Sequence, residues 1–259
     1  SSDLHCFESW TLNSSSKPKA TWSKKLHFGN KARIRFKNIE KDNKKSHVTS
    51  NLYYSAKDIL LPTWWESNQD LLQTIASRRT RYNLSPHPIK TQDLSAICSA
   101  LWWINSKRNI PSAGAKYPIE LYMILFASEL FKKPALVYYN TDNHSLSFIK
   151  DVPNWEDLRW ILWWNLEQLD GSPSFCVFIV WEPSRTMEKY GERGGRFVLL
   201  EAWALMQNIS IIGHSLNIGT IITWWYFDNE IAELFDIDKN QCMICSSIIW
   251  WYISSHETH

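Results

Sequence analysis

The chain has 259 residues, 44% of them hydrophobic, so it can bury a sizeable core, and its length favours one large domain over two. A formal net charge of +2 lacks the strong basic excess typical of nucleic-acid-binding domains. The longest apolar runs are of strand length, far short of the roughly 20 residues that span a bilayer, and no signal segment opens the sequence. We therefore expect no nucleic-acid partner, no membrane anchor and a cytoplasmic location.

The five cysteines are scattered and odd in number, which argues against a disulfide framework. Cys242 and Cys245 form one short pair, but they lie in a β-prone run where residues three apart point to opposite faces. We expect buried structural thiols and no metal site, with a metal or redox role for this pair as the minor alternative.

Residues 1–60 are polar and basic, and we interpret them as a solvated, partly disordered arm, with a docking surface as the alternative. Residues 31–39 alternate as in an edge strand. Residues 61–259 form the main domain. It opens with a helix over 68–81, and the spacing of five residues predicts a buried face: Asp70, Leu71, Leu72, Ile75 and Ala76.

A second helix is expected from an N-cap at Thr91 to about Trp102. Strands follow at 120–127, 136–139 and 145–149, the last two as a hairpin, then a helix at 155–165 and a strand at 175–181. The segment 195–217, closed by Gly219, is the most apolar helix and is expected in the core or in a dimer interface. A helix at 229–235 and a strand at 243–249 complete an α+β fold, a mixed or antiparallel sheet surrounded by helices.

Four motifs in order carry a family resemblance. They are RRTRYNLS (78–85), PSAGAKYP (111–118), KYGERGGRF (189–197) and YFDNEIAELFDID (226–238). Their order resembles the SagB-type dehydrogenase branch of the nitroreductase superfamily over roughly residues 68–253. The resemblance implies a nitroreductase-like fold, an intertwined homodimer with FMN at the subunit interface, and oxidation of thiazolines or oxazolines to thiazoles or oxazoles. It also implies a ribosomally made precursor peptide as substrate and a cyclodehydratase as partner.

FMN carries a dianionic phosphate and a flat apolar ring, so its pocket needs cations at one end and closely approaching backbone at the other. By resemblance, Arg79 and Arg81, with Arg78 close behind, contact the phosphate or ribityl chain. The alternative is that they are surface cations at a helix end. Ser112, Ala113 and Gly114 are expected beside the ring, or else form a plain turn. Further cofactor contacts are expected from Arg196 and Trp225.

Azoline oxidation needs a base for the ring proton, and by resemblance Lys189 and Tyr190 supply it. Both groups ordinarily titrate near pH 10, so burial or nearby cations such as Arg193 and Arg196 must lower the pKa. The alternative is that Lys189 and Glu188 only solvate a loop. A general nitroreductase needs no such base, so this pair distinguishes the two enzyme classes.

Tryptophan is abundant, with 16 residues against only 8 glycines. Several indoles stand where the family has glycine: Trp103, Trp203, Trp225, and Trp250 or Trp251. Glycine serves where backbone approaches a ligand or takes a positive φ. Either the flavin pocket has diverged into a flavin-free interaction subunit, or UGA codons meaning glycine were translated as tryptophan. The matching surplus and deficit favour mistranslation.

Overall fold

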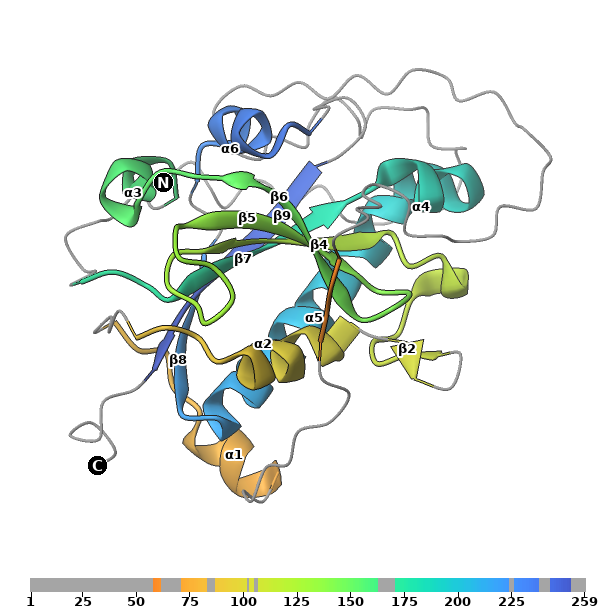
Figure 1. Ribbon diagram of the computed structural model, residues 1–259. Helices are drawn as coiled ribbons and strands as arrows, with labels where there is room; N and C mark the ends of the chain where they lie inside the picture. The colour runs from red at the N-terminus through yellow and green to blue at the C-terminus, as the bar shows by residue number, and fades with distance from the viewer. Residues whose placement is uncertain are drawn as a thin grey trace, which may run out of the picture.

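A seven-stranded antiparallel sheet forms the centre of the computed structural model, which describes residues 58–61, 71–82, 87–101, 103–104, 107–162, 171–223, 226–237 and 243–252. The strand order is β1-β6-β5-β4-β7-β9-β8 (Figure 1). The strands are β1 (Ile59–Leu60), β4 (Ile119–Leu125), β5 (Ala135–Asn140), β6 (Ser145–Asp151), β7 (Phe175–Trp181), β8 (Ile218–Thr223) and β9 (Met243–Tyr252). A separate small ribbon pairs β2 (Trp103–Ile104) with β3 (Lys107–Arg108).

Both faces of the central strands are covered, as their continuous apolar sequences dictate. Along β4, Leu121, Met123 and Leu125 enter one core cluster, whereas Tyr122 and Ile124 enter the other. This alternation follows from the two-residue period of a strand. The sheet therefore needs a helical layer on each side.

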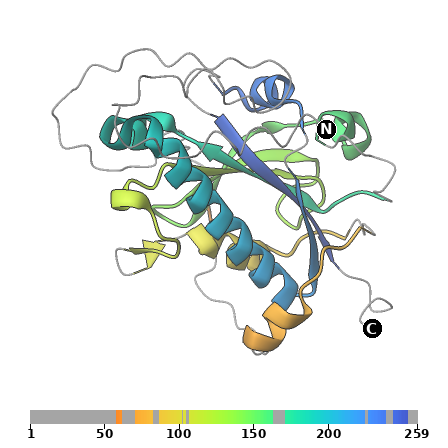
Figure 2. The same cartoon turned by 180° about the vertical axis from the view of Figure 1, so that it is seen from behind.

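The helices divide between these two layers (Figures 1 and 2). The first core cluster contains residues of α2 (Thr91–Cys98), the turn η4 (Ser99–Leu101) and the long α5 (Gly194–Ser215), whose end contacts α1 (Leu71–Ser77). The second contains residues of α3 (Trp155–Leu162) and α6 (Asp228–Phe235). A short helix, α4 (Pro183–Tyr190), follows β7 and leads through the turn η7 (Gly191–Arg193) into α5.

The stretch Pro183–Ser215 is long and apolar enough to cross a membrane by length and composition. Its interior positions, including Val198, Ala202, Leu205 and Ile209, instead pack into the core against the sheet. We therefore assign α5 as a core helix.

The α+β class, the β5–β6 hairpin and the strand at 175–181 are confirmed, and the sheet is antiparallel in every named pairing of the described chain. Helix α6 and strand β9 fall where they were expected. Cys98 and Cys176 are buried free thiols, as predicted. The expectations for residues 1–57, including the strand at 31–39, and for Cys242 lie outside the described residues.

Several predicted helix boundaries, and the predicted burial of α1, were wrong. Lys90, not Thr91, occupies the N-cap of α2, because the Glu129 carboxylate accepts the Thr91 amide at 2.9 Å and replaces a side-chain cap. Helix α5 ends at Ser215, with Asn217 at positive φ, and Gly219 lies inside β8, a strand that was not expected. The predicted buried face of α1 is largely exposed in a single chain: Leu71, Leu72 and Ile75 are 62%, 76% and 47% exposed, and Thr74 is the buried residue.

Candidate functional site

The loop 111–118 meets the end of α4 at Gly114. This residue has φ +60°, and a Cβ built on it would lie 2.8 Å from Lys189 Nζ and closer still to the Tyr190 hydroxyl. Glycine is favoured there, because the left-handed backbone strains other residues and a side chain would have to displace the ends of both Lys189 and Tyr190. The structure thus brings together the two predicted catalytic groups and the predicted ring-contacting loop.

Lys189 and Tyr190 end the helix α4, whereas the alternative interpretation placed Lys189 and Glu188 in a loop. Glu182 caps α4 by accepting the Ser184 amide at 3.3 Å, and Pro183 takes the first turn, where it needs no hydrogen-bond donor. Lys189 Nζ lies 5.2 Å from the centre of the Tyr190 ring, which packs edge-on against Phe197 of α5 at 5.0 Å. The lysine is exposed and the tyrosine half-buried, so both can meet a substrate.

Ser112 closes the loop from inside. Its Oγ accepts the Tyr117 amide at 2.8 Å, and its hydroxyl donates to the carboxylate of Glu201 on α5. Glu201 is only 3% exposed, and one of its oxygens, Oε1, has no hydrogen-bond partner among the described residues. Burial raises the pKa of Glu201 to about 7, against the opposing effects of the Ser112 hydrogen bond and the Arg108 charge. A carboxyl group that titrates near neutrality therefore lies behind the loop.

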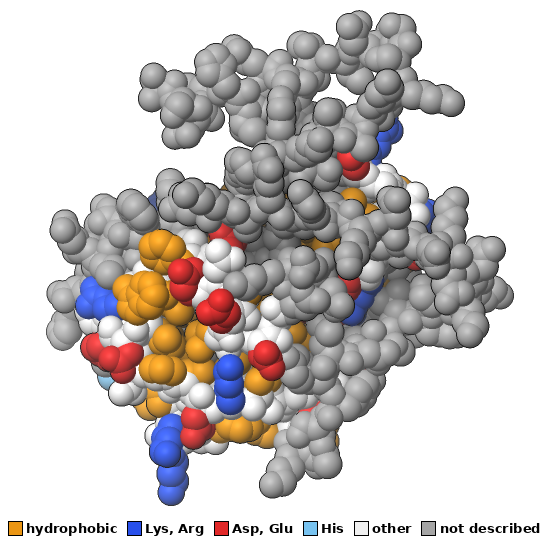
Figure 3. Space-filling view, turned by 90° about the horizontal axis from the view of Figure 1, so that it is seen from above, with side chains coloured by type: hydrophobic (Ala, Val, Ile, Leu, Met, Phe, Trp, Pro, Cys, Tyr) orange, Lys and Arg blue, Asp and Glu red, His pale blue; other side chains and the backbone are white. Residues whose placement is uncertain are grey.

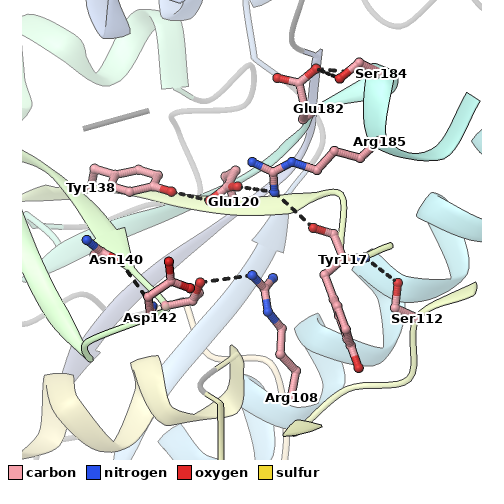
Figure 4. A network of polar contacts seen from close by, with 11 residues as sticks. Arg108, Ser112, Tyr117, Glu120, Tyr138, Asn140, Asp142, Glu182, Ser184 and Arg185 are labelled. Atoms are coloured by element: carbon pink, nitrogen blue, oxygen red, sulfur yellow. Dashed lines mark hydrogen bonds and ion pairs between the residues drawn. The ribbon is translucent and has the colours of Figure 1, made fainter. Parts of the chain in front are cut away.

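Glu120, at the start of β4, is fully buried and anchors a polar network (Figure 4). It accepts a hydrogen bond from the Tyr138 hydroxyl of β5 and forms an ion pair with Arg185 of α4. Arg185 also donates to the Tyr117 carbonyl at 3.1 Å. Burial opposes the charge on Arg185, but Glu120 outweighs it, so the pKa of Arg185 lies above its ordinary value. Burial and the neighbouring carboxylate raise the pKa of Tyr138.

Arg108 lies beside this network. Its guanidinium stands 4.9 Å over the ring of Tyr117 and donates to Thr141 Oγ1 at 3.0 Å. Burial, together with the nearby Arg185 cation, lowers the pKa of Arg108, although Glu120 works in the opposite direction. Tyr117 is thereby held from both sides while it carries a positive φ of 43°.

The predicted phosphate-binding arginines gather at the other end of α5. Arg79 donates to the carbonyls of Ala76 and Arg78, both at 2.8 Å, and so caps the end of α1 as the alternative interpretation proposed. Arg81 is half-buried, and its Nε has no partner among the described residues. His214 of α5 lies near this group, and its Nε2 is 2.9 Å from Ser77 Oγ. Burial lowers the pKa of His214, and the charges of the three arginines lower it further.

One chain does not bring the arginines to the loop 111–118. His214 marks the arginine end of α5 and Glu201 marks the loop end, and at the helical rise of 1.5 Å per residue they are about 20 Å apart. The predicted cation site and the predicted ring site are therefore separate within a single copy.

Of the remaining predicted residues, Ala113 is half-buried and opens the turn η5 (Ala113–Ala115), whose other two residues are exposed. Arg196 is exposed on α5, and Trp225 lies outside the described residues. Trp203 is 55% exposed on α5. Trp250 and Trp251 lie inside β9, and none of the described tryptophans has a positive φ. A positive φ is therefore no reason to expect glycine at these described positions. The remaining reason is close approach of the backbone to a ligand.

The face formed by α3 and α6 differs from the site. Hydrophobic side chains gather there beside acidic ones, and the Lys and Arg side chains are scattered (Figure 3). Trp160 is 53% exposed and packs on Phe227 at 5.9 Å. Among the described residues, no group of three or more His, Cys, Asp or Glu side chains could hold a metal ion.

Sequence reasoning missed Arg108, Glu120, Arg185 and Glu201. Glu120 opens an apolar strand and Glu201 stands in the most apolar helix, and a carboxylate in such a setting is almost always paired. That signal was present in the sequence and pointed to a buried polar network.

Comparisons with known proteins agree with this architecture. Residues 75–248 match the nitroreductase family. A nitroreductase-named protein of Methanocaldococcus jannaschii is 29% identical over 173 residues, covering 65% of this chain and 85% of its own. The microcin B17-processing protein McbC of Escherichia coli is 24% identical over 136 residues, which span 51% of this chain and half of McbC.

Solved structures share the fold. A nitroreductase-named protein from Ralstonia eutropha superposes with a TM-score of 0.65 at 20% identity, over 77% of this chain and 90% of that one. The E. coli microcin synthetase McbBCD complex with truncated pro-MccB17 gives 0.61 at 16% identity, over 77% and 79%. A Desulfovibrio desulfuricans protein in complex with FMN gives 0.50 at 13% identity, over 74% and 91%.

Proposed function

Because this chain belongs to the nitroreductase family, we propose that it is an FMN-dependent oxidoreductase that converts thiazoline or oxazoline rings of a ribosomally made peptide into thiazoles or oxazoles. The observation that carries the proposal is the meeting of Lys189 and Tyr190 at Gly114. General nitroreductase chemistry does not require this pair of proton-transferring groups.

The reaction removes two hydrogens from the azoline ring. One leaves as a proton from the carbon beside the carbonyl, and FMN, when bound, supplies the acceptor for the hydride from the neighbouring carbon. Lys189 Nζ and the Tyr190 hydroxyl both lie beside Gly114, so one group can accept the ring proton while the other orients that group by a hydrogen bond. Arg185 links α4 to the loop 111–118, because it pairs with the buried Glu120 and donates to the Tyr117 carbonyl.

The residues present fit FMN. Arg81 offers a buried Nε without a partner among the described residues, and Arg78 adds a second cation for a phosphate. At the other end, Ser112, Ala113 and Gly114 present backbone that a flat ring can approach. We assign phosphate contact to the arginines and ring contact to the loop.

Two copies of the chain reconcile these assignments. Within one copy the two sites are about 20 Å apart along α5, so we assign the arginines of one copy and the loop of another to the same FMN. The exposed apolar residues of α1, together with Leu199, Leu200 and Trp203 of α5, supply a surface for that contact. We therefore propose a homodimer in the cytoplasm with FMN at the subunit interface.

The substrate and partner follow from two kinds of similarity. The motifs resemble the SagB-type branch, and McbC, a microcin B17-processing protein, is a relative whose structure is known in a synthetase complex. We propose that this chain works beside a cyclodehydratase on a precursor peptide. The second candidate is a general NAD(P)H-dependent nitroreductase, which the higher identity to the M. jannaschii protein favours.

The test is to incubate the purified flavin-loaded protein with an azoline-containing peptide in air and to measure the mass of the product by mass spectrometry. We expect a loss of two hydrogens per ring, abolished in Lys189→Met and strongly reduced in Tyr190→Phe, while both variants retain flavin. If the ring is unchanged while NADH and a nitroaromatic compound are consumed, the second candidate is correct.

A further inference from the structure

An ion pair between Glu120 and Arg185 lies one helical turn before the Lys189–Tyr190 pair. Glu120 is fully buried on β4, and the Arg185 side chain is 15% exposed on α4. A buried carboxylate is costly unless its oxygens are paired, and here they meet Arg185 and the Tyr138 hydroxyl. The pair thus fixes one point of α4 against the sheet (Figure 4).

The same guanidinium reaches the loop. Arg185 Nη1 donates to the Tyr117 carbonyl at 3.1 Å, and the Tyr117 amide donates to Ser112 Oγ at 2.8 Å. Next to it, the Glu182 amide donates to the Pro118 carbonyl at 2.9 Å. One side chain of α4 therefore contacts both the strand β4 and the loop that carries Gly114.

Helix α4 has only eight residues, so its own hydrogen bonds do not hold it in place and tertiary contacts must do so. Arg185 and Lys189 are four residues apart and lie on the same face. Gly194 adds close packing, since a Cβ there would lie 3.0 Å from Thr186 Cγ2. The position of Lys189 over Gly114 depends on where these contacts set the helix.

We infer that Arg185, held by Glu120, is a positioning residue that couples α4 to the loop 111–118 and so sets the geometry of Lys189 and Tyr190 against the substrate. This inference rests on the proposed function for its kinetic consequence only. The coupling itself is a property of the chain and can be measured without any substrate.

The first variant is Arg185→Lys, which keeps a cation for Glu120 but ends one atom short of Nη1, the atom that meets both Glu120 and the Tyr117 carbonyl. Hydrogen–deuterium exchange should rise in the loop 111–118 and in α4, but not in the β5–β6 hairpin. With an azoline peptide, kcat should fall about 100-fold with KM nearly unchanged, as expected when catalytic groups are displaced by about 1 Å. Glu188→Gln, on the exposed side of α4, is the matched control and should change neither quantity.

Tyr138→Phe is a milder second variant, which removes one hydrogen bond from Glu120 and leaves the cation in place. It should change exchange and kcat in the same direction by a smaller factor, and it serves if the lysine variant does not fold. Normal loop exchange in folded variants overturns the inference, as does a lower thermal stability with unchanged kcat. If the wild type does not oxidise azolines but the exchange result holds, the coupling stands and the proposed function fails.

Discussion

Replacing Glu201 with glutamine should remove a pH-dependent loss of stability. Burial raises the pKa of this carboxyl from its ordinary value of 4.5 to about 7. Between these values the unfolded chain releases the proton and the folded chain keeps it, so folding stability falls as the pH rises. Each tenfold change in an ionisation constant is worth about 1.4 kcal/mol, so the full loss is about 3 kcal/mol. Glutamine has a similar shape, still accepts from Ser112 and does not titrate.

The assay is denaturant unfolding of the wild type and Glu201→Gln at fixed flavin concentration between about pH 4.5 and pH 8. The amide adds an offset that does not vary with pH, so the informative quantity is the difference between the two free energies of unfolding. We expect this difference to grow by about 3 kcal/mol in favour of the variant as the pH rises. Glu188→Gln, an exposed control, should run parallel to the wild type. Parallel curves for Glu201→Gln would refute the assignment of a neutral buried carboxyl behind the loop.

Three further variants, and one measurement on the protein from its natural source, test other parts of the account. Gly114→Ala should cost about 1–2 kcal/mol in thermal unfolding, because the backbone is left-handed, and should lower kcat at least tenfold, because the methyl group displaces the catalytic pair. Arg81→Met should weaken FMN binding about 10- to 100-fold in a fluorescence titration, since it removes a charge-assisted hydrogen bond. The lowered pKa of His214 means that stability is lost as the pH falls below 6.5, so His214→Gln should lose less on acidification, and equal losses would contradict this. Mass spectrometry of peptide 197–239 from the natural source should show glycine at Trp203 if UGA encodes glycine, and tryptophan there would end that interpretation.

The regular elements were predictable where one periodicity ran without interruption. The strand at 175–181 was found to the residue, because seven apolar positions stand between polar turns. Strand β8 was missed because Ile218–Thr223 continues the apolar composition of α5 after a short turn, with no change of period to mark the boundary. Helix α4 was missed because it is short and mostly polar, and its inner face consists of Pro183, Thr186 and Met187 only, although Pro183 after Glu182 is a typical helix start.

The candidate site divides in the same way. Lys189, Tyr190 and Gly114 were found by motif, and the structure places them in contact. Their supports, Glu120 and Arg185, are 65 positions apart in the sequence, and a local pattern cannot pair residues at that distance. The burial of α1 was misjudged because apolar spacing shows which residues share a helix face but not whether that face packs within the chain.

The proposed function depends on the source of the electrons. The most direct measurement is a single turnover without oxygen, in which the flavin-loaded protein is mixed with an azoline peptide and the visible absorption of oxidised flavin is followed. We predict bleaching by the peptide alone, at a rate that falls sharply in Lys189→Met. Bleaching only after NADH or NADPH is added would contradict azoline oxidation and identify a general nitroreductase.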